Sequence, residues 1–502
     1  MTSFAPPLFE FPLATRISPP VKLAIAIGLA ALADLLFWSH RIGLSMVLFA
    51  ALLFAAALLA NHVWSDRRRT LIAAMIVIAG LIPAVEDLNF LSLLFAIGSV
   101  GIGIAVASNP GFSKITDGLR AFLDLFLVGP FRIIGDVVRM TNIRAIETGF
   151  ALWFVPLVFG AIFVFLFASA NPLIARWLSV LNLRELSDQI NLARTLFWIF
   201  LLSTVWPFLH VRWRSWTMHK AVTPPPLPQT SEPAPASDLP GFFGADAILR
   251  SLILFNVLFA IQTVLDLVFL WGNAKLPDGI SYADYAHRGA YPLIVTALLA
   301  AGFVLAAMRP GGPAQTSAIL RPLVYLWVGQ NVMLVISSML RLYRYMEIYL
   351  LTGWRIAALV WMLLVAIGLV LIVARIILEQ SNGWLARMNL IGLLATLYVC
   401  SLVNFDAIIA DYNVTHSKEA SGKGVNLDLN YLYTLGPQAL PALARAAQLP
   451  GITVRDCGRG RLVSNQEADM ASWRSWGFRS WRLQRWLDAY PDTPNETPKT
   501  AG

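Results

Sequence analysis

Seven charged or titratable side chains in three separate segments could perform acid–base chemistry or bind a charged ligand together. The segments lie at 278–292, 340–352 and 404–413, and each adjoins a long apolar stretch. Carboxylates and imidazole exchange protons, and arginine pairs with anions. We expect all three segments to emerge on one face of a helical bundle. The candidate binding residues are Asp284, His287, Arg288, Arg341, Glu347, Asp406 and Asp411.

Two interpretations of these charges stay open. The residues either form one shared site or make separate structural salt bridges, while the neighbouring tyrosines form an aromatic belt at the membrane surface. A shared site predicts that Arg288 or Arg341 pairs with one of the carboxylates and that Asp411 lies at the mouth of a cavity. The alternative is that Asp406 and Asp411 only cap the start of the following segment.

Polar residues inside apolar stretches are the second group of candidates. Asp34 lies within the first such stretch, and it has either a structural hydrogen bond or a role in a transport pathway. Asp266 lies near the end of its stretch, where an interfacial position explains it. Gln330 and Asn331 are more typical of interhelical hydrogen bonds than of ligands.

The motifs of common cofactor and metal enzymes are absent from the sequence. It contains no P-loop, no HExxH motif and no GxSxG motif. Its two cysteines, Cys400 and Cys457, are too few for a zinc cluster or a disulfide framework. We therefore expect no cofactor and no metal site.

The composition is that of a membrane protein. The 502 residues are 57% hydrophobic and 13% charged, against about 25% charged in soluble domains. The net charge of +9 fits basic loops beside a membrane rather than nucleic-acid binding. About eleven stretches are long enough to cross a bilayer. We expect an all-α polytopic protein with spans at 21–39, 42–62, 71–88, 90–108, 148–170, 194–211, 248–271, 290–308, 321–340, 355–377 and 384–404.

The remaining segments divide the chain. Residues 1–220 form a first bundle of six spans and 241–404 a second bundle of five, joined by a proline-rich linker at 221–240. Within the first bundle, 109–147 is amphipathic and predicts two short interfacial helices broken at Gly129-Pro130. Residues 405–502 form a small helical tail, whose Trp- and Arg-rich end fits a lipid surface or a small helical core.

The distribution of basic residues predicts the orientation. The run Arg67-Arg68-Arg69 after the second span marks a cytoplasmic loop. With an odd number of spans, the N-terminus is then cytoplasmic and the C-terminus extracytoplasmic. The arginines near Arg341, Arg344 and Arg355 oppose this rule, so either they pair with Glu347 or one span is misplaced.

Three motifs resemble a known family. The stretches at 278–292, 340–352 and 404–413, in this order, resemble a bacterial family of multipass membrane proteins defined only as a domain of unknown function. The resemblance covers about residues 245–450 and implies a bacterial inner-membrane protein. It implies no activity, substrate or catalytic residue.

Three functional hypotheses remain. The first is transport or flipping of a small or lipidic solute, which the many spans and few intramembrane polar groups favour. The second is a membrane sensor or scaffold without catalysis. The third is an outer-face enzyme that acts on lipid-linked substrates. Its partners are therefore the lipid bilayer and a small-molecule or lipid ligand, and not a nucleic acid.

Overall fold

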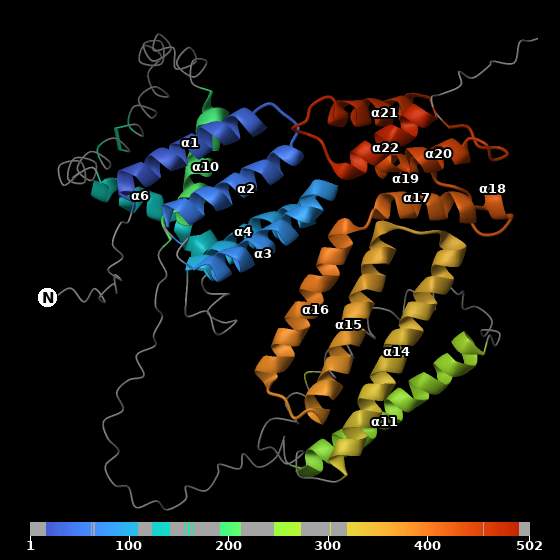
Figure 1. The fold of residues 1–502 in the computed structure, drawn as a ribbon. Helices are drawn as coiled ribbons and strands as arrows, with labels where there is room; N and C mark the ends of the chain where they lie inside the picture. Colours follow the sequence, from blue (N-terminus) through green and yellow to red (C-terminus); the bar gives the residue numbers. More distant parts are fainter. Residues whose placement is uncertain are drawn as a thin grey trace, which may run out of the picture. The chain divides into compact units, whose positions relative to one another are not determined.

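The described part of the chain is helical throughout. The computed structural model describes residues 17–61, 66–108, 123–140, 191–211, 245–272, 319–454 and 456–490, with isolated positions at 63, 156, 159, 160, 163 and 302. These residues form helices and turns without a strand among them, which confirms the all-α class for this part (Figure 1). The chain divides into two compact units, Met1–Met218 with Ala468–Gly502, and His219–Glu467.

The first unit is built on five long apolar helices. They are α1 (Pro19–Phe37), α2 (Leu44–Ala60), α3 (Arg67–Glu86), α4 (Phe90–Ser108) and α10 (Leu192–Leu209). Local sequence features define the N-termini of these helices. Proline occupies the first turn of α1, and the side chains of Asp66 and Asn191 cap α3 and α10. Small residues bring α3 and α4 together, since a Cβ on Gly80 would lie 2.2 Å from that of Ser99.

A continuous helical segment replaces the two short helices that we expected around Gly129-Pro130. A π-helical turn, η2 (Asp124–Val128), continues directly into α6 (Gly129–Met140). The wider π turn lets the N–H of Gly129 donate to the carbonyl of Asp124, and the proline then falls in the first turn of α6, where it lacks no required donor. Arg132 binds both carboxylate oxygens of Asp124, at 2.5 and 2.6 Å, across this junction.

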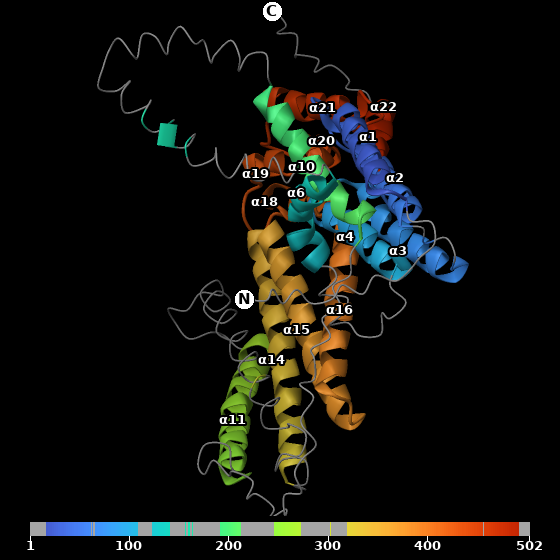
Figure 2. The same cartoon turned by 90° about the vertical axis from the view of Figure 1, so that its left-hand side faces the viewer.

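The second unit contains four further long helices. They are α11 (Ala245–Asp266), which ends in a π turn η3 (Leu267–Trp271), α14 (Leu320–Tyr349), α15 (Gly353–Ile377) and α16 (Asn382–Leu402). Helices α14, α15 and α16 run side by side, connected by short turns (Figures 1 and 2). Helix α14 continues to Tyr349, well past the expected end of this span at 340, because residues 341–349 contain no glycine or proline that would stop it.

Short helices follow α16 in the same unit. They are α17 (Phe405–His416), α18 (Lys418–Ser421), α19 (Leu429–Thr434), η4 (Pro437–Ala439), α20 (Leu440–Ala446) and α21 (Asp456–Met470). Side chains of Asn404 and Asp428 cap α17 and α19. The buried residues of α20 pack with α17, while α22 (Phe478–Ala489) belongs to the first unit.

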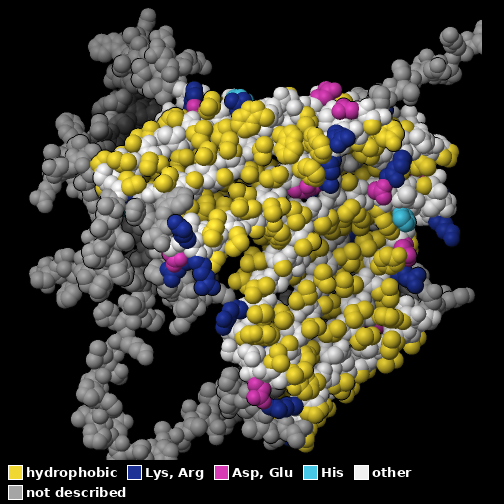
Figure 3. Space-filling view, viewed as in Figure 1, with side chains coloured by type: hydrophobic (Ala, Val, Ile, Leu, Met, Phe, Trp, Pro, Cys, Tyr) yellow, Lys and Arg dark blue, Asp and Glu magenta, His cyan; other side chains and the backbone are white. Residues whose placement is uncertain are grey.

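The long helices make this a multi-pass membrane protein. Among the described residues, eight helices are long and apolar enough to cross a membrane, and α2 is an apolar helix of 17 residues. Hydrophobic side chains cover most of the described surface in the view of Figure 3, and charged side chains occur there in small groups. Apart from a few isolated positions, the expected spans at 148–170 and 290–308 lie outside the described residues, so the count of eleven stays a prediction.

Candidate functional site

A buried ion pair joins two membrane-spanning helices of the second unit. The guanidinium of Arg341 in α14 donates to the carboxylate of Asp266 at the end of α11. Only 5% of the Arg341 side chain and 1% of the Asp266 side chain are exposed. Breaking a buried pair leaves an uncompensated charge at a cost of about 3–5 kcal/mol, so each residue depends on the other for its buried position.

The carboxylate lies at an irregular point of its helix. Gln262, one turn earlier, donates to Asp266 at 3.0 Å, and the π turn η3 begins at the next residue. At the end of that turn, the indole N–H of Trp271 donates to the hydroxyl of Ser337 in α14 at 3.3 Å. π turns are rare and frequently occur at functional sites, so this segment makes the pair a candidate functional residue pair.

Amide side chains continue the polar surface toward the middle of the same two helices. Asn256 of α11 donates to the carbonyl of Leu323 at 3.1 Å, and Gln330 of α14 donates to the carbonyl of Asn256 at 3.2 Å. Asn256 and Asn331 are 6% and 0% exposed. These bonds confirm that Gln330 makes an interhelical hydrogen bond, as the sequence predicts. We call Asn256, Asp266, Gln330, Asn331 and Arg341 the α11–α14 polar face.

Several polar atoms next to this face have no partner. The side-chain oxygens of Asn256, Gln330 and Asn331, and the indole N–H of Trp327, are buried without a hydrogen bond to any residue that the structure describes. A buried polar atom left unpaired costs about 1–3 kcal/mol. Four such atoms on neighbouring residues of α11 and α14 mark a candidate binding site.

The structure gives the sequence-predicted residues of the second unit separate partners. A carboxylate oxygen of Glu347 lies 3.9 Å from a guanidinium nitrogen of Arg344, and both side chains are exposed. Asp411 pairs with Arg445 of α20, and these two side chains are also exposed. Asp406 lies in the first turn of α17, behind the capping Asn404. Arg341 pairs with Asp266, which the sequence analysis placed at the membrane interface. Asp284, His287 and Arg288 lie outside the described residues.

In the first unit, the intramembrane Asp34 also binds an arginine. Arg194 of α10 donates to both carboxylate oxygens of Asp34 in α1, through its Nε at 3.0 Å and through a second nitrogen. The Asp34 side chain is 9% exposed and that of Arg194 is 51% exposed. The guanidinium carbon lies 5.9 Å from the ring centroid of Trp38. Asp34 thus connects α1 to α10, and half of the Arg194 side chain stays accessible.

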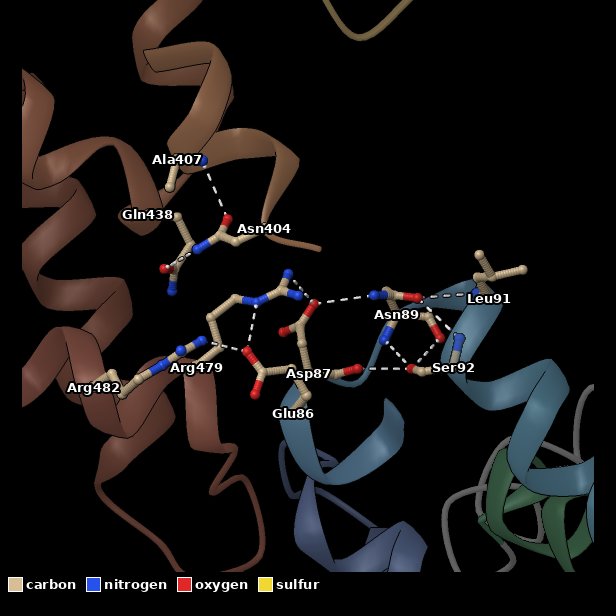
Figure 4. A network of polar contacts seen from close by, with 10 residues as sticks. All are labelled: Glu86, Asp87, Asn89, Leu91, Ser92, Asn404, Ala407, Gln438, Arg479 and Arg482. Carbon is tan, nitrogen blue, oxygen red and sulfur yellow. Dashed lines mark hydrogen bonds and ion pairs between the residues drawn. The ribbon is translucent and has the colours of Figure 1, made fainter. Parts of the chain in front are cut away.

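The C-terminal residues of the first unit form a second charged cluster. Arg479 of α22 donates to Asp87 at 3.1 Å and lies 3.6 Å from Glu86, which also pairs with Arg482 (Figure 4). Asn89 donates to Asp87 at 3.1 Å in the turn between α3 and α4. Since only 6% of the Arg479 side chain is exposed, this residue ties the C-terminal segment to the α3–α4 turn.

Sequence reasoning missed the role of Asp266 and Asn256, although their spacing held a signal. Asn256, Thr263 and Asp266 recur at seven and three residues along α11, which places them on one helix face. Gln330, Ser337 and Arg341 do the same along α14 at seven and four residues. Among the described residues no group of three or more His, Cys, Asp and Glu side chains is placed to hold a metal ion.

Comparison with known proteins assigns the family. A family model described as a domain of unknown function, DUF4153, matches residues 23–446. This range contains the α11–α14 polar face and all seven sequence-predicted binding residues. No curated protein and no solved structure matches the chain significantly. The chain belongs to the DUF4153 family, and it is a multi-pass membrane protein of that family.

Proposed function

We propose that this protein moves a polar solute, or the polar headgroup of a lipid, across the membrane along the α11–α14 polar face. The observation that carries the proposal is the buried Asp266–Arg341 pair inside two membrane-spanning helices. Ionisable residues within membrane-spanning helices are expensive, and they are typical of substrate and ion pathways. Asn256 precedes Asp266 by ten residues, so the polar face extends about 15 Å along α11.

A purely structural role explains this arrangement less well. Well-packed apolar residues of similar volume usually stabilise a protein as much as a buried ion pair does. A helix pair that only had to pack would also need neither a π turn beside the carboxylate nor unpaired amide oxygens. Charges and hydrogen-bonding groups that can exchange partners are what a transport pathway requires.

We propose a bacterial inner membrane as the location, with the N-terminus cytoplasmic and the C-terminus extracytoplasmic. In the first unit, residues 469–482 contact the turns after α1 and α3, at the helix ends opposite Arg67. The arginines that oppose the charge rule have local partners: Arg344 faces Glu347, and Arg355 donates to the carbonyls of Tyr349 and Leu350. Asp284, His287 and Arg288 follow α11 in the sequence, and we propose that they belong to the outer entrance.

A double substitution tests the proposal without leaving a lone buried charge. Asp266→Leu with Arg341→Met removes both charges, so we expect a protein that folds and inserts. In a deletion strain that accumulates a solute or lipid, this variant should fail to clear it at wild-type membrane abundance. The control is Arg344→Gln with Glu347→Gln, which removes an exposed pair of the same helix and should act as wild type. Clearance by the apolar double variant would overturn the proposal.

One observation favours the scaffold hypothesis. Residues 469–482 are attached to the first unit by Arg479 and by an ion pair of 2.6 Å between Arg41 and Asp469. A scaffold needs such a fixed surface but no intramembrane charge. The same double variant distinguishes the two functions, because a scaffold should tolerate the loss of the Asp266–Arg341 pair.

A further inference from the structure

The four unpaired polar atoms near the middle of α11 and α14 have a fixed chemical character. The amide N–H groups of Asn256 donate to the carbonyls of Leu252 and Leu323 at 2.8 and 3.1 Å. Those of Gln330 and Asn331 donate to the carbonyls of Asn256 and Trp327 at 3.2 and 2.8 Å. Turning any of these amides over would bring its oxygen against a carbonyl oxygen. The three unpaired atoms are therefore acceptors.

These atoms also share one location. Gln330 and Asn331 are adjacent in α14, and Trp327 is one turn before them. The Trp327 ring lies against Phe255 and Phe259 of α11, with ring centroids 6.2 and 6.1 Å apart. Asn256 is the next residue after Phe255, and its carbonyl accepts from Gln330. Trp327 is 1% exposed, so its unpaired indole N–H adds one buried donor to three buried acceptors.

The balance of three acceptors and one donor selects among ligand types. An anion would face three acceptor oxygens, and a bare cation would leave the indole N–H unpaired. A hydroxyl group donates one hydrogen bond and accepts others, so a ligand with several hydroxyl groups satisfies all four atoms.

We infer that Asn256, Trp327, Gln330 and Asn331 form a binding site for the hydroxyl groups of a sugar or polyol. The ligand is either a free solute or the headgroup of a glycolipid. This inference deepens the proposed transport function by naming its substrate class, and it rests on that function only for the statement that the ligand is transported. Binding itself can be tested separately.

The test uses the full chain in lipid nanodiscs and follows its thermal unfolding midpoint. A ligand that binds the folded state raises the midpoint in a saturable way. The probes are glucose in solution, and nanodiscs that contain a diglucosyl diacylglycerol. Nanodiscs with diacylglycerol lacking the sugar, and sodium chloride alone, are the controls. We expect a saturable rise with at least one sugar source and with neither control.

Asn331→Leu separates binding from folding. The substitution removes a buried oxygen without a described partner, together with one hydrogen bond from the amide to the Trp327 carbonyl of the same helix. The two effects oppose each other, so the ligand-free variant should unfold close to the wild-type temperature. Its affinity for the sugar probe should nevertheless fall at least about tenfold, since the leucine offers no acceptor. Ser338→Ala is the matched control, because the Ser338 hydroxyl only donates to the carbonyl of Leu334 in its own helix. That variant should keep the full ligand response.

Each other outcome has a defined meaning. The inference is wrong if neither sugar source raises the midpoint, which is what a structural water on these atoms predicts. It is equally wrong if Asn331→Leu responds as wild type, or if sodium chloride alone gives the response. A sugar response without solute accumulation in the deletion strain would overturn transport and leave the binding site in place. If solute accumulation depends on Asp266 and Arg341 but no sugar raises the unfolding midpoint, the sugar site is wrong and the transport function stands.

Discussion

Asn413 of α17 binds both backbone polar groups of Leu351, in the turn between α14 and α15. Its side-chain oxygen accepts from the N–H of Leu351 at 2.7 Å, and its amide donates to the carbonyl at 2.9 Å. The preceding Leu350 has φ 62° and ψ −176°, a conformation that side chains other than glycine rarely adopt. One buried amide thus holds a strained turn and fixes α17 to the ends of two membrane helices.

The first prediction follows from this contact. Asn413→Ala should lower the free energy of unfolding by about 2–4 kcal/mol, because it leaves two buried backbone groups unpaired. Thermal unfolding of the purified protein in detergent measures the effect. Thr415→Ala removes only an exposed hydroxyl of the same helix and should change stability by less than about 0.5 kcal/mol. Equal stability of the two variants would contradict the role of Asn413.

The second prediction concerns coupling within the buried ion pair. Asp266→Asn and Arg341→Gln should each destabilise the second unit by about 3–5 kcal/mol, because each leaves one buried charge alone. The variant with both substitutions should be more stable than the sum of the single effects implies. A double-mutant cycle on unfolding midpoints tests this. Strict additivity would show that the two side chains do not interact.

The third prediction concerns the attachment of the C-terminal segment to the first unit. A Cβ on Gly43 would lie 2.5 Å from the backbone carbon of Ser475, and the N–H of Leu44 donates to the carbonyl of Trp476 at 2.8 Å. Gly43→Ala should therefore cost about 1–3 kcal/mol and make residues 471–477 sensitive to protease. Gly98→Ala, which meets no atom within 4 Å in α4, should be neutral or slightly stabilising. Protease resistance of the first variant would refute the close approach.

The fourth prediction is a pH dependence at high pH. Burial, followed by the nearby Tyr343 and Glu347, raises the pKa of Tyr412 above its usual value. The unfolded chain then loses this proton first, so the contribution of Tyr412 is complete below about pH 10 and declines as the pH rises further. Tyr412→Phe keeps the ring stacked on His416 and should remove that part of the decline. Unfolding midpoints between about pH 9 and 11 provide the test, and identical profiles would disprove it.

The fifth prediction tests the proposed orientation. A reporter enzyme that is active only outside the cytoplasm should give signal when fused after Leu276 or Gly422, and none after Pro225. Fusions of a cytoplasm-specific reporter at the same sites should give the opposite pattern. A signal after Pro225 would reverse the orientation and would place the Arg341 end of α14 inside the cell.

Hydrophobic stretches predicted the long helices because length and apolar content are local properties. The expected span at 355–377 and helix α15 (Gly353–Ile377) agree closely. The break expected at Gly129-Pro130 was wrong because Gly129 lies against α10, where a Cβ would be 2.6 Å from Pro207. That contact joins residues distant in sequence, so no local pattern predicts it.

The candidate site was harder to predict because pairing depends on which helices become neighbours. The sequence suggested an interfacial position for Asp266, but in the structure it pairs with Arg341 of α14. Asp411 pairs with Arg445 of α20. A single sequence gives the charge of each residue but not its partner. The same limit applies to Asn256 and Asn331, whose unpaired oxygens follow only from the positions of the surrounding backbone carbonyls.

The return of the chain to the first unit at Ala468 has a consequence for synthesis. Ribosomes release the N-terminal helices first, yet Glu86 and Asp87 meet Arg479 only after the second unit has been made. Until then the turn between α3 and α4 carries two carboxylates without their arginine, while the second unit is inserted. Attachment of residues 469–482 to the first unit therefore follows synthesis of the second unit, and a stop codon before Arg479 would remove contacts of helices that were translated much earlier.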